Sequence, residues 1–214
     1  MKAAVAEREP GVVWVPKKGA SRDVSKPRPT FGLGDVSLLR MLCEDEQTTC
    51  ILWVLVTSGL RIGEVLALDW EDVDLENGTV RVHKHLLRNG TLARGRKKHP
   101  DADVLQPLHQ DAVTALRNLL STRDAKTGPV WLNSLGERLS YHAWYDRWGS
   151  LRKAYGLEHM HTHDIRSVHL TAFAEHATMK EVLERGGHSD YRSAMRYQRP
   201  DAQRQKEIVA QMSF

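Results

Sequence analysis

Three short segments of the sequence hold side chains that could bind a phosphate group and attack it. The segment TSGLRIGE places Arg61 after a glycine turn at the start of a predicted helix, where the helix dipole and the unbonded N–H groups favour an anion. The segment HDIR places His163 and Arg166 three residues apart, so both side chains share one face of a helix. Arginine can grip two phosphate oxygens at once, and histidine can donate a hydrogen bond or move a proton. Each motif alone also fits an ordinary solvated helix, so the prediction of a site depends on their combination.

The third segment, GGHSDYRSAMRYQRP, supplies His188 and two tyrosines, Tyr191 and Tyr197. A tyrosine near its ordinary pKa of roughly 10 is a poor nucleophile at neutral pH. It needs a neighbouring base or a strong positive field to become reactive. Two arginines and two histidines that meet at one phosphate would supply both. The alternative is a surface helix whose tyrosines only anchor it by packing.

Charge is unevenly distributed along the chain, although the net charge is only +4 and the isoelectric point is about 9.1. Residues 64–76 contain six acids and no lysine or arginine, whereas residues 81–100 contain seven lysines or arginines, three histidines and no acid. Such a basic stretch is typical of a phosphate-binding surface, and the alternative is a solvated basic hairpin without a partner. The candidate DNA contacts within it are Lys84, Arg88, Arg94, Arg96 and Lys97.

Several other chemistries find no support in the sequence. There is no phosphate-binding loop of the P-loop type and no GxSxG motif. The histidines at 159, 161, 163 and 169 are dense, but no HExxH motif accompanies them and the cysteines are distant, so we predict neither a metal nor another cofactor. Cys43 and Cys50 are predicted to be reduced core residues. The acids of 69–76 alternate with Trp70, Val73 and Leu75, which predicts a strand with its acids in water rather than a two-metal site.

The elements that must position these groups are mostly helices. Apolar spacing predicts helices over 35–47, 48–60, 61–68, 111–122, 139–157, 161–177 and 179–187, with further helical segments in 193–198 and 201–212. Alternation predicts strands over 78–87 and 104–109. The aromatic stripe between residues 141 and 155 follows one helix face, so core packing is favoured over base stacking. The expected fold class is α+β, mostly helical with a small antiparallel β-sheet near residues 70–108.

The ordered set of these motifs resembles the catalytic domain of tyrosine recombinases, the phage integrase family. The resemblance covers roughly residues 30–214, and ALDWEDVDLENGTVRV is similar to the family's segment that enters its β-hairpin. It implies the tyrosine recombinase catalytic-domain fold over 30–214 and a tail or interdomain linker over 1–29. The N-terminal core-binding domain of the family has no counterpart in residues 1–29, so we expect either a truncated chain or a short integrase.

The resemblance also implies a role for each matching residue. Arg61 and Arg166 would clamp the scissile phosphate and stabilise its pentacoordinate transition state. His163 would act as the acid/base partner, and His188 would donate a hydrogen bond to the phosphate. Tyr197 would attack phosphorus, form a 3′-phosphotyrosyl link and release a 5′-hydroxyl.

Two supporting residues and two departures complete the comparison. The family's hairpin lysine, which protonates the leaving oxygen, corresponds to Lys98 when counted back from the following strand, with Lys97 adjacent. Glu64 stands where the family usually has an acid, and it either orients basic residues or lies on a solvated helix face. Ser167 replaces a histidine that is common in the family, and Gly186 replaces an apolar residue; neither change removes a group needed for catalysis.

The function implied by the resemblance is site-specific DNA recombination without a metal, for integration or excision of a phage or mobile element. The expected partners are double-stranded DNA sites and three further copies of the chain in a homotetramer, with residues 201–214 docking between protomers. No membrane partner is expected, because no apolar run approaches the length of a membrane span, and the cytoplasm of a bacterial host is the default location. The alternatives are DNA relaxation of the type IB topoisomerase kind and a non-catalytic DNA-binding protein on the same fold.

Overall fold

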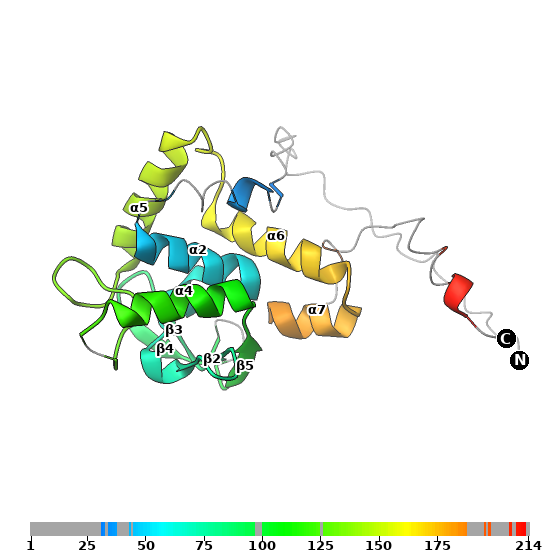
Figure 1. The fold of residues 1–214 in the computed structure, drawn as a ribbon, viewed down its shortest axis with the longest axis horizontal. Coiled ribbons are helices and arrows are strands. Elements are labelled where there is room, and N and C mark those ends of the chain that lie inside the picture. Colours follow the sequence, from blue (N-terminus) through cyan, green and yellow to red (C-terminus); the bar gives the residue numbers. More distant parts are fainter. Residues whose placement is uncertain are drawn as a thin grey trace, which may run out of the picture. The chain divides into compact units, whose positions relative to one another are not determined.

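The computed structural model describes residues 31–32, 34–37, 43, 45–96, 100–124, 126–187, 195, 197, 206 and 209–212. Its helices are α2 (Glu46–Ser58), α3 (Ile62–Leu66), α4 (Gln110–Ser121), α5 (Tyr141–Ala154), α6 (Thr162–Ala174) and α7 (Met179–Gly186). Its strands are β1 (Val73–Asp74), β2 (Thr79–Val82), β3 (Lys84–Leu86), β4 (Leu92–Arg94) and β5 (Val104–Pro107). This is the predicted mostly helical α+β fold (Figure 1). The proposed tail, residues 1–29, lies outside the described residues.

Helix α2 is the central element of the fold, and its sequence sets both of its ends. The Asp45 side chain accepts a hydrogen bond from the backbone N–H of Thr48 and caps the first turn. Gly59 ends the helix in the left-handed conformation, with φ of 66°, and its N–H donates to the carbonyl of Leu55. Nine of the thirteen residues between these caps are buried, because α4 and α6 pack against this helix (Figure 1).

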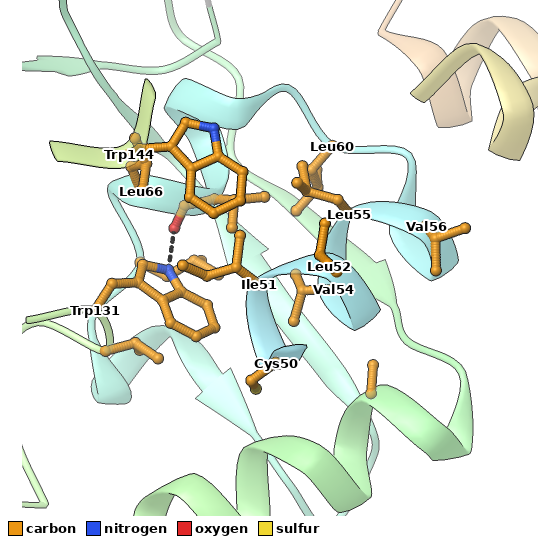
Figure 2. Close-up of a cluster of buried hydrophobic side chains, with 14 of the residues drawn as sticks. Cys50, Ile51, Leu52, Val54, Leu55, Val56, Leu60, Leu66, Trp131 and Trp144 are labelled. Atoms are coloured by element: carbon orange, nitrogen blue, oxygen red, sulfur yellow. Dashed lines mark hydrogen bonds between the residues drawn. The ribbon is translucent and has the colours of Figure 1, made fainter. Parts of the chain in front are cut away.

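The hydrophobic core combines α2 with three fully buried indoles, Trp131, Trp144 and Trp148. Figure 2 shows the side chains of α2 beside Trp131 and Trp144. The Trp131 indole N–H donates to the carbonyl of Val65 at 2.6 Å, which satisfies its polar atom inside the core. The prediction that the aromatic stripe of α5 packs in the core is therefore confirmed for Trp144 and Trp148, whereas Tyr145 is 40% exposed.

The β-structure is antiparallel, as predicted, but it divides into two sheets. Strands β1, β2 and β5 form one sheet, in which β2 pairs with both neighbours. Strands β3 and β4 form a separate hairpin, with Lys84 opposite Arg94. The single strand predicted over 78–87 changes partner at His83, so it belongs to both sheets.

The prediction that the acids after α3 face water is wrong for Asp69 and Asp72. Lys84 forms ion pairs with both carboxylates, Arg138 pairs with Asp69, and His83 Nε2 lies 2.7 Å from Asp72 Oδ1. Burial would raise the pKa of Asp72, but hydrogen bonds from Lys84, the Asp69 N–H and His83 lower it. Local alternation failed here because basic residues distant in sequence fold back onto the acids.

Within the described residues, no helix combines the length and the apolar character that crossing a membrane requires.

The end of α2 lies against helix α6, and this contact leaves room only for glycine at position 59. A β-carbon at Gly59 would stand 2.3 Å from Cδ2 of His169, a ring carbon in the buried part of α6. Gly156 also has φ of 66°, but no atom lies within 4 Å of the β-carbon that it would carry.

We expect Gly59→Ala to destabilise the protein more than Gly156→Ala does. Both changes carry the left-handed penalty of about 1–2 kcal/mol, and only Gly59→Ala adds a clash with a packed ring. Equilibrium urea denaturation of the two variants measures the difference. Equal losses of unfolding free energy would show that the contact with His169 does not constrain this turn.

Candidate active site

A buried carboxylate, that of Glu64, lies at the centre of the site with only 1% of its surface exposed. Its Oε1 accepts from Arg61 Nη1 at 3.0 Å and from Arg96 Nε at 2.9 Å. Its Oε2 accepts from the Arg61 backbone N–H at 2.9 Å and from Arg96 Nη2 at 3.3 Å. Glu64 therefore closes the first turn of α3 and binds two guanidinium groups at once, and it lies in the interior instead of on a solvated helix face.

The ionised state of Glu64 follows from these neighbours. Burial would raise its pKa, but the charge and hydrogen bonds of Arg96, together with Arg61, lower the pKa to about 2. The carboxylate is therefore charged at neutral pH, when it compensates the arginines around it.

Arg166 is held by backbone carbonyls on both sides. Its side chain projects from α6, is 1% exposed, and donates through Nη1 to Gly59 O and through Nη2 to Gly186 O. Arg61 Nη2 donates to the next carbonyl, that of Gly187, at 3.1 Å. The carbonyls at the end of α7 thus hold Arg61 and Arg166, the two arginines that the family resemblance predicts as a pair.

The charged groups of the site lie close enough to change one another's pKa values. Burial and the charges of Arg61 and Arg96 together lower the pKa of Arg166 to about 10, although the charges of Glu64 and Tyr197 act in the opposite direction. Three guanidinium groups against one carboxylate leave a net charge of +2 in a largely buried region. Such an excess favours an anion that enters the site.

Tyr197 is 4% exposed and packs in a second hydrophobic cluster with Leu170, Ala174 and Val182. It therefore lies beside α6 and α7, the helices that carry Arg166 and end at Gly186. His163 stands exposed in the first turn of α6, one turn before Arg166. The structure thus brings Arg61, Glu64, Arg166 and Tyr197 together. His188 and Lys98 lie outside the described residues, and their roles stay predictions.

The five proposed DNA contacts differ in their surroundings. Arg88 and Arg94 are exposed on the β3–β4 hairpin, as a DNA contact requires. Lys84 is bound to the two carboxylates described above, and Arg96 is buried at Glu64. Lys97 lies outside the described residues.

Arg96 is the member of the site that sequence reasoning placed elsewhere. In the sequence it is one of several basic residues in a polar loop, and no local signal separates it from its neighbours. In the structure its guanidinium lies under Gly187, where an added β-carbon would stand 2.7 Å from Arg96 Nη1. Gly187 adopts φ of 53° and ends α7 as its C-cap.

The histidines of the 159–169 segment point in different directions. His159 stacks on Phe31, the side chain of His169 is buried beside Val56, and at His161 it is the backbone N–H that donates to Asp164 Oδ2 at the start of α6. In the part of the chain that the structure describes, no three His, Cys, Asp or Glu side chains gather as a metal site.

Comparison with known proteins identifies the family. The model of the phage integrase family matches residues 36–204. The chain belongs to the phage integrase family. It is 33% identical over 178 residues to the integrase of Mycobacterium phage D29, covering 76% of this chain and 46% of that protein. It is 29% identical over 167 residues to the tyrosine recombinase XerC of Actinobacillus pleuropneumoniae serotype 7, covering 74% and 49%.

The integrase fold is confirmed by solved structures. The Tn1549 transposon integrase in complex with circular intermediate DNA superposes with a TM-score of 0.75 at 18% identity, over 89% of this chain and 69% of that one. This chain spans about half the length of the two curated relatives named above.

We expect Glu64→Gln to lower the free energy of unfolding by about 3–5 kcal/mol, because it leaves the buried guanidinium of Arg96 and the partly buried one of Arg61 without their counter-charge. The matched control is Glu76→Gln, an exposed carboxylate whose loss should change stability by less than about 0.5 kcal/mol. Urea denaturation at neutral pH measures both.

The variants Glu64→Gln and Glu76→Gln, compared with the wild type at several pH values, also test whether Glu64 is ionised. Its folded-state pKa of about 2 lies below the ordinary value of 4.5, so its stabilising contribution is complete above pH 4.5 and is lost as the pH falls toward 2. The difference in unfolding free energy between the wild type and Glu64→Gln should therefore become smaller as the pH is lowered. A difference that stays constant from neutral pH down to pH 3 would contradict this assignment. Equal losses of unfolding free energy in Glu64→Gln and Glu76→Gln would contradict it as well.

Proposed function

We propose that this chain is a site-specific DNA recombinase that cleaves and rejoins strands through a 3′-phosphotyrosyl intermediate. The observation that carries the proposal is the meeting of Arg61, Arg166 and Tyr197, which come from three separate segments, around one cluster of net positive charge. Membership of the phage integrase family supports the same reaction.

In the proposed reaction, the Tyr197 oxygen attacks phosphorus, and the bond from phosphorus to the 5′-oxygen breaks. The guanidinium groups of Arg61 and Arg166 stabilise the negative charge that develops on the non-bridging oxygens. His163 serves as the acid/base group, His188 donates to the phosphate, and the hairpin lysine at 98, or its neighbour at 97, protonates the leaving oxygen. Attack by a 5′-hydroxyl of another strand then reverses these steps and restores a phosphodiester.

The polar groups around Arg61 and Arg166 would hold these two side chains in the position that the reaction requires. Glu64, itself bound by Arg96, holds Arg61 on one side, and on the other the carbonyl of Gly187 holds Arg61 and that of Gly186 holds Arg166. A transition-state contact is most effective when its donors need no rearrangement during the reaction. We therefore assign Glu64 and Arg96 to positioning.

The proposed partners are two duplex DNA sites and a homotetramer of recombinase chains in the cytoplasm or nucleoid of a bacterial host. Arg88 and Arg94 are the exposed residues of the hairpin suited to phosphate contacts. Segment 201–214 would dock on a neighbouring protomer, and within it Val209 and Met212 are 63% and 52% exposed. Their exposure leaves both side chains available for the proposed intermolecular contact.

We expect Tyr197→Phe to abolish covalent attachment to a nicked half-site while the fold is retained, because only the hydroxyl is removed. Tyr145→Phe, at an exposed tyrosine of α5, is the control and should form the adduct at the wild-type rate. Denaturing gel electrophoresis of protein with labelled DNA detects the product. Loss of the adduct in Tyr191→Phe instead would contradict the assignment, and relaxation of supercoiled DNA without paired sites would favour a topoisomerase.

Replacement of Arg166 should slow cleavage by about two to three powers of ten, the usual effect of removing one oxyanion contact. Arg166→Lys, which keeps the positive charge, guards against a loss caused only by unfolding of the buried site. Single-turnover rates at saturating DNA, with circular dichroism of each variant, give the comparison. Cleavage should be unchanged in EDTA, and inhibition by the chelator would point to a required metal.

A further inference from the structure

We propose that His169 and Arg185 form a positioning pair that fixes the end of α7 and thereby the two arginines of the site. The inference rests on the proposed function only for its catalytic readout. The pair joins three elements, because His169 lies on α6, Arg185 lies on α7, and both bind carbonyls at the end of α2.

The contacts of Arg185 are specific and largely shielded from solvent. Its Nε donates to His169 Nε2 at 3.2 Å, and its Nη2 donates to Thr57 O at 2.9 Å. Its guanidinium carbon lies 5.4 Å from the centre of the Phe173 ring, which itself stacks on His169. Cation, imidazole and phenyl ring therefore form one packed unit between α6 and α7.

These contacts require a neutral imidazole in one tautomer. His169 Nδ1 lies 2.9 Å from Val56 O, which can only accept, so Nδ1 carries the hydrogen. Nε2 faces the N–H of Arg185 and must therefore present its lone pair. Burial, and then the charge of Arg185, lower the pKa of His169 to about 4, so the neutral form prevails at neutral pH.

Each partner of the pair adjoins a carbonyl that holds Arg166. The His169 ring lies against Gly59, whose carbonyl accepts from Arg166 Nη1. Arg185 immediately precedes Gly186, whose carbonyl accepts from Arg166 Nη2. Gln106 Nε2 reinforces the link, because it donates to Ser58 O at 2.9 Å and reaches Arg185 O at 3.5 Å.

The sequence of α7 explains why a polar anchor matters here. Val182 and Gly186 are the buried residues of this short helix, and Gly186 has no side chain to pack. The last turn of α7 packs through Leu183, and the side chain of Arg185 is the polar group that ties this turn to α2 and α6. Displacement of this turn would move the carbonyls of Gly186 and Gly187 and, with them, Arg166 and Arg61.

The test uses three variants: Arg185→Ala, His169→Gln and the double variant that combines these two changes. The control is Lys180→Ala, at an exposed residue of the same helix. We expect single-turnover adduct formation to fall about 10- to 100-fold at saturating DNA in each of the first three, because small displacements of catalytic groups have effects of this size. The dissociation constant for DNA should change by less than about two-fold. The double variant should lose no more than the larger single loss, since the pair acts as one unit.

A second measurement keeps the inference independent of catalysis. The Gly187 N–H donates to Glu184 O at 3.0 Å in the last turn of α7, so its hydrogen exchange reports the order of that turn. Exchange should accelerate in Arg185→Ala and His169→Gln, less in Arg185→Lys, and not in Lys180→Ala. Unchanged exchange, or additive losses in the double variant, would overturn the inference. Absence of an adduct in the wild-type protein would instead contradict the proposed function. The hydrogen-exchange measurement would then decide alone whether His169 and Arg185 fix the end of α7.

Discussion

The carboxylate of Glu64, buried between Arg61 and Arg96, is the interaction on which the rest of the site depends. Guanidinium groups that converge on a phosphate repel one another before the phosphate arrives, and burial strengthens this repulsion. One ionised acid bound by Arg61 and Arg96 offsets it and still leaves a net positive charge near Arg166. Because Arg96 follows the β3–β4 hairpin and Arg61 begins α3, the same carboxylate also joins two distant parts of the chain.

Backbone carbonyls also help to hold the arginines of the site. Carbonyls at the ends of α2 and α7 accept from Arg61 and Arg166, and both helices end at glycines in the left-handed conformation. A side chain at Gly59 would also collide with His169, and one at Gly187 would collide with Arg96. Both the close packing and the left-handed turn therefore require glycine at these two positions. The site is thus built at helix ends, where unbonded carbonyls are available to hold cations.

Much of this arrangement could be predicted from local sequence, and the remainder depends on long-range contacts. The end of α2 near Gly59 followed from the local sequence, whereas the pairing of Arg61 with Arg166 followed from the resemblance of their motifs to the integrase family. The burial of Arg96 and the ion pairs of Asp72 did not, because partners that are remote in sequence decide whether a charged residue faces water. The same limit applies to His169 and Arg185, whose pairing needs α6 and α7 to be placed first.

The most direct test of the account is to identify the tyrosine that becomes linked to DNA. Trypsin cleavage after Arg185, Arg192 and Arg196 separates the peptide 186–192, which carries Tyr191, from the peptide 197–204, which begins with Tyr197. Mass spectrometry of a trapped and nuclease-trimmed adduct should find the 3′-phosphonucleotide on the peptide 197–204. A nucleotide on the peptide 186–192, or on any other tyrosine, would contradict the assignment of Arg61, Arg166 and Tyr197 to one catalytic site.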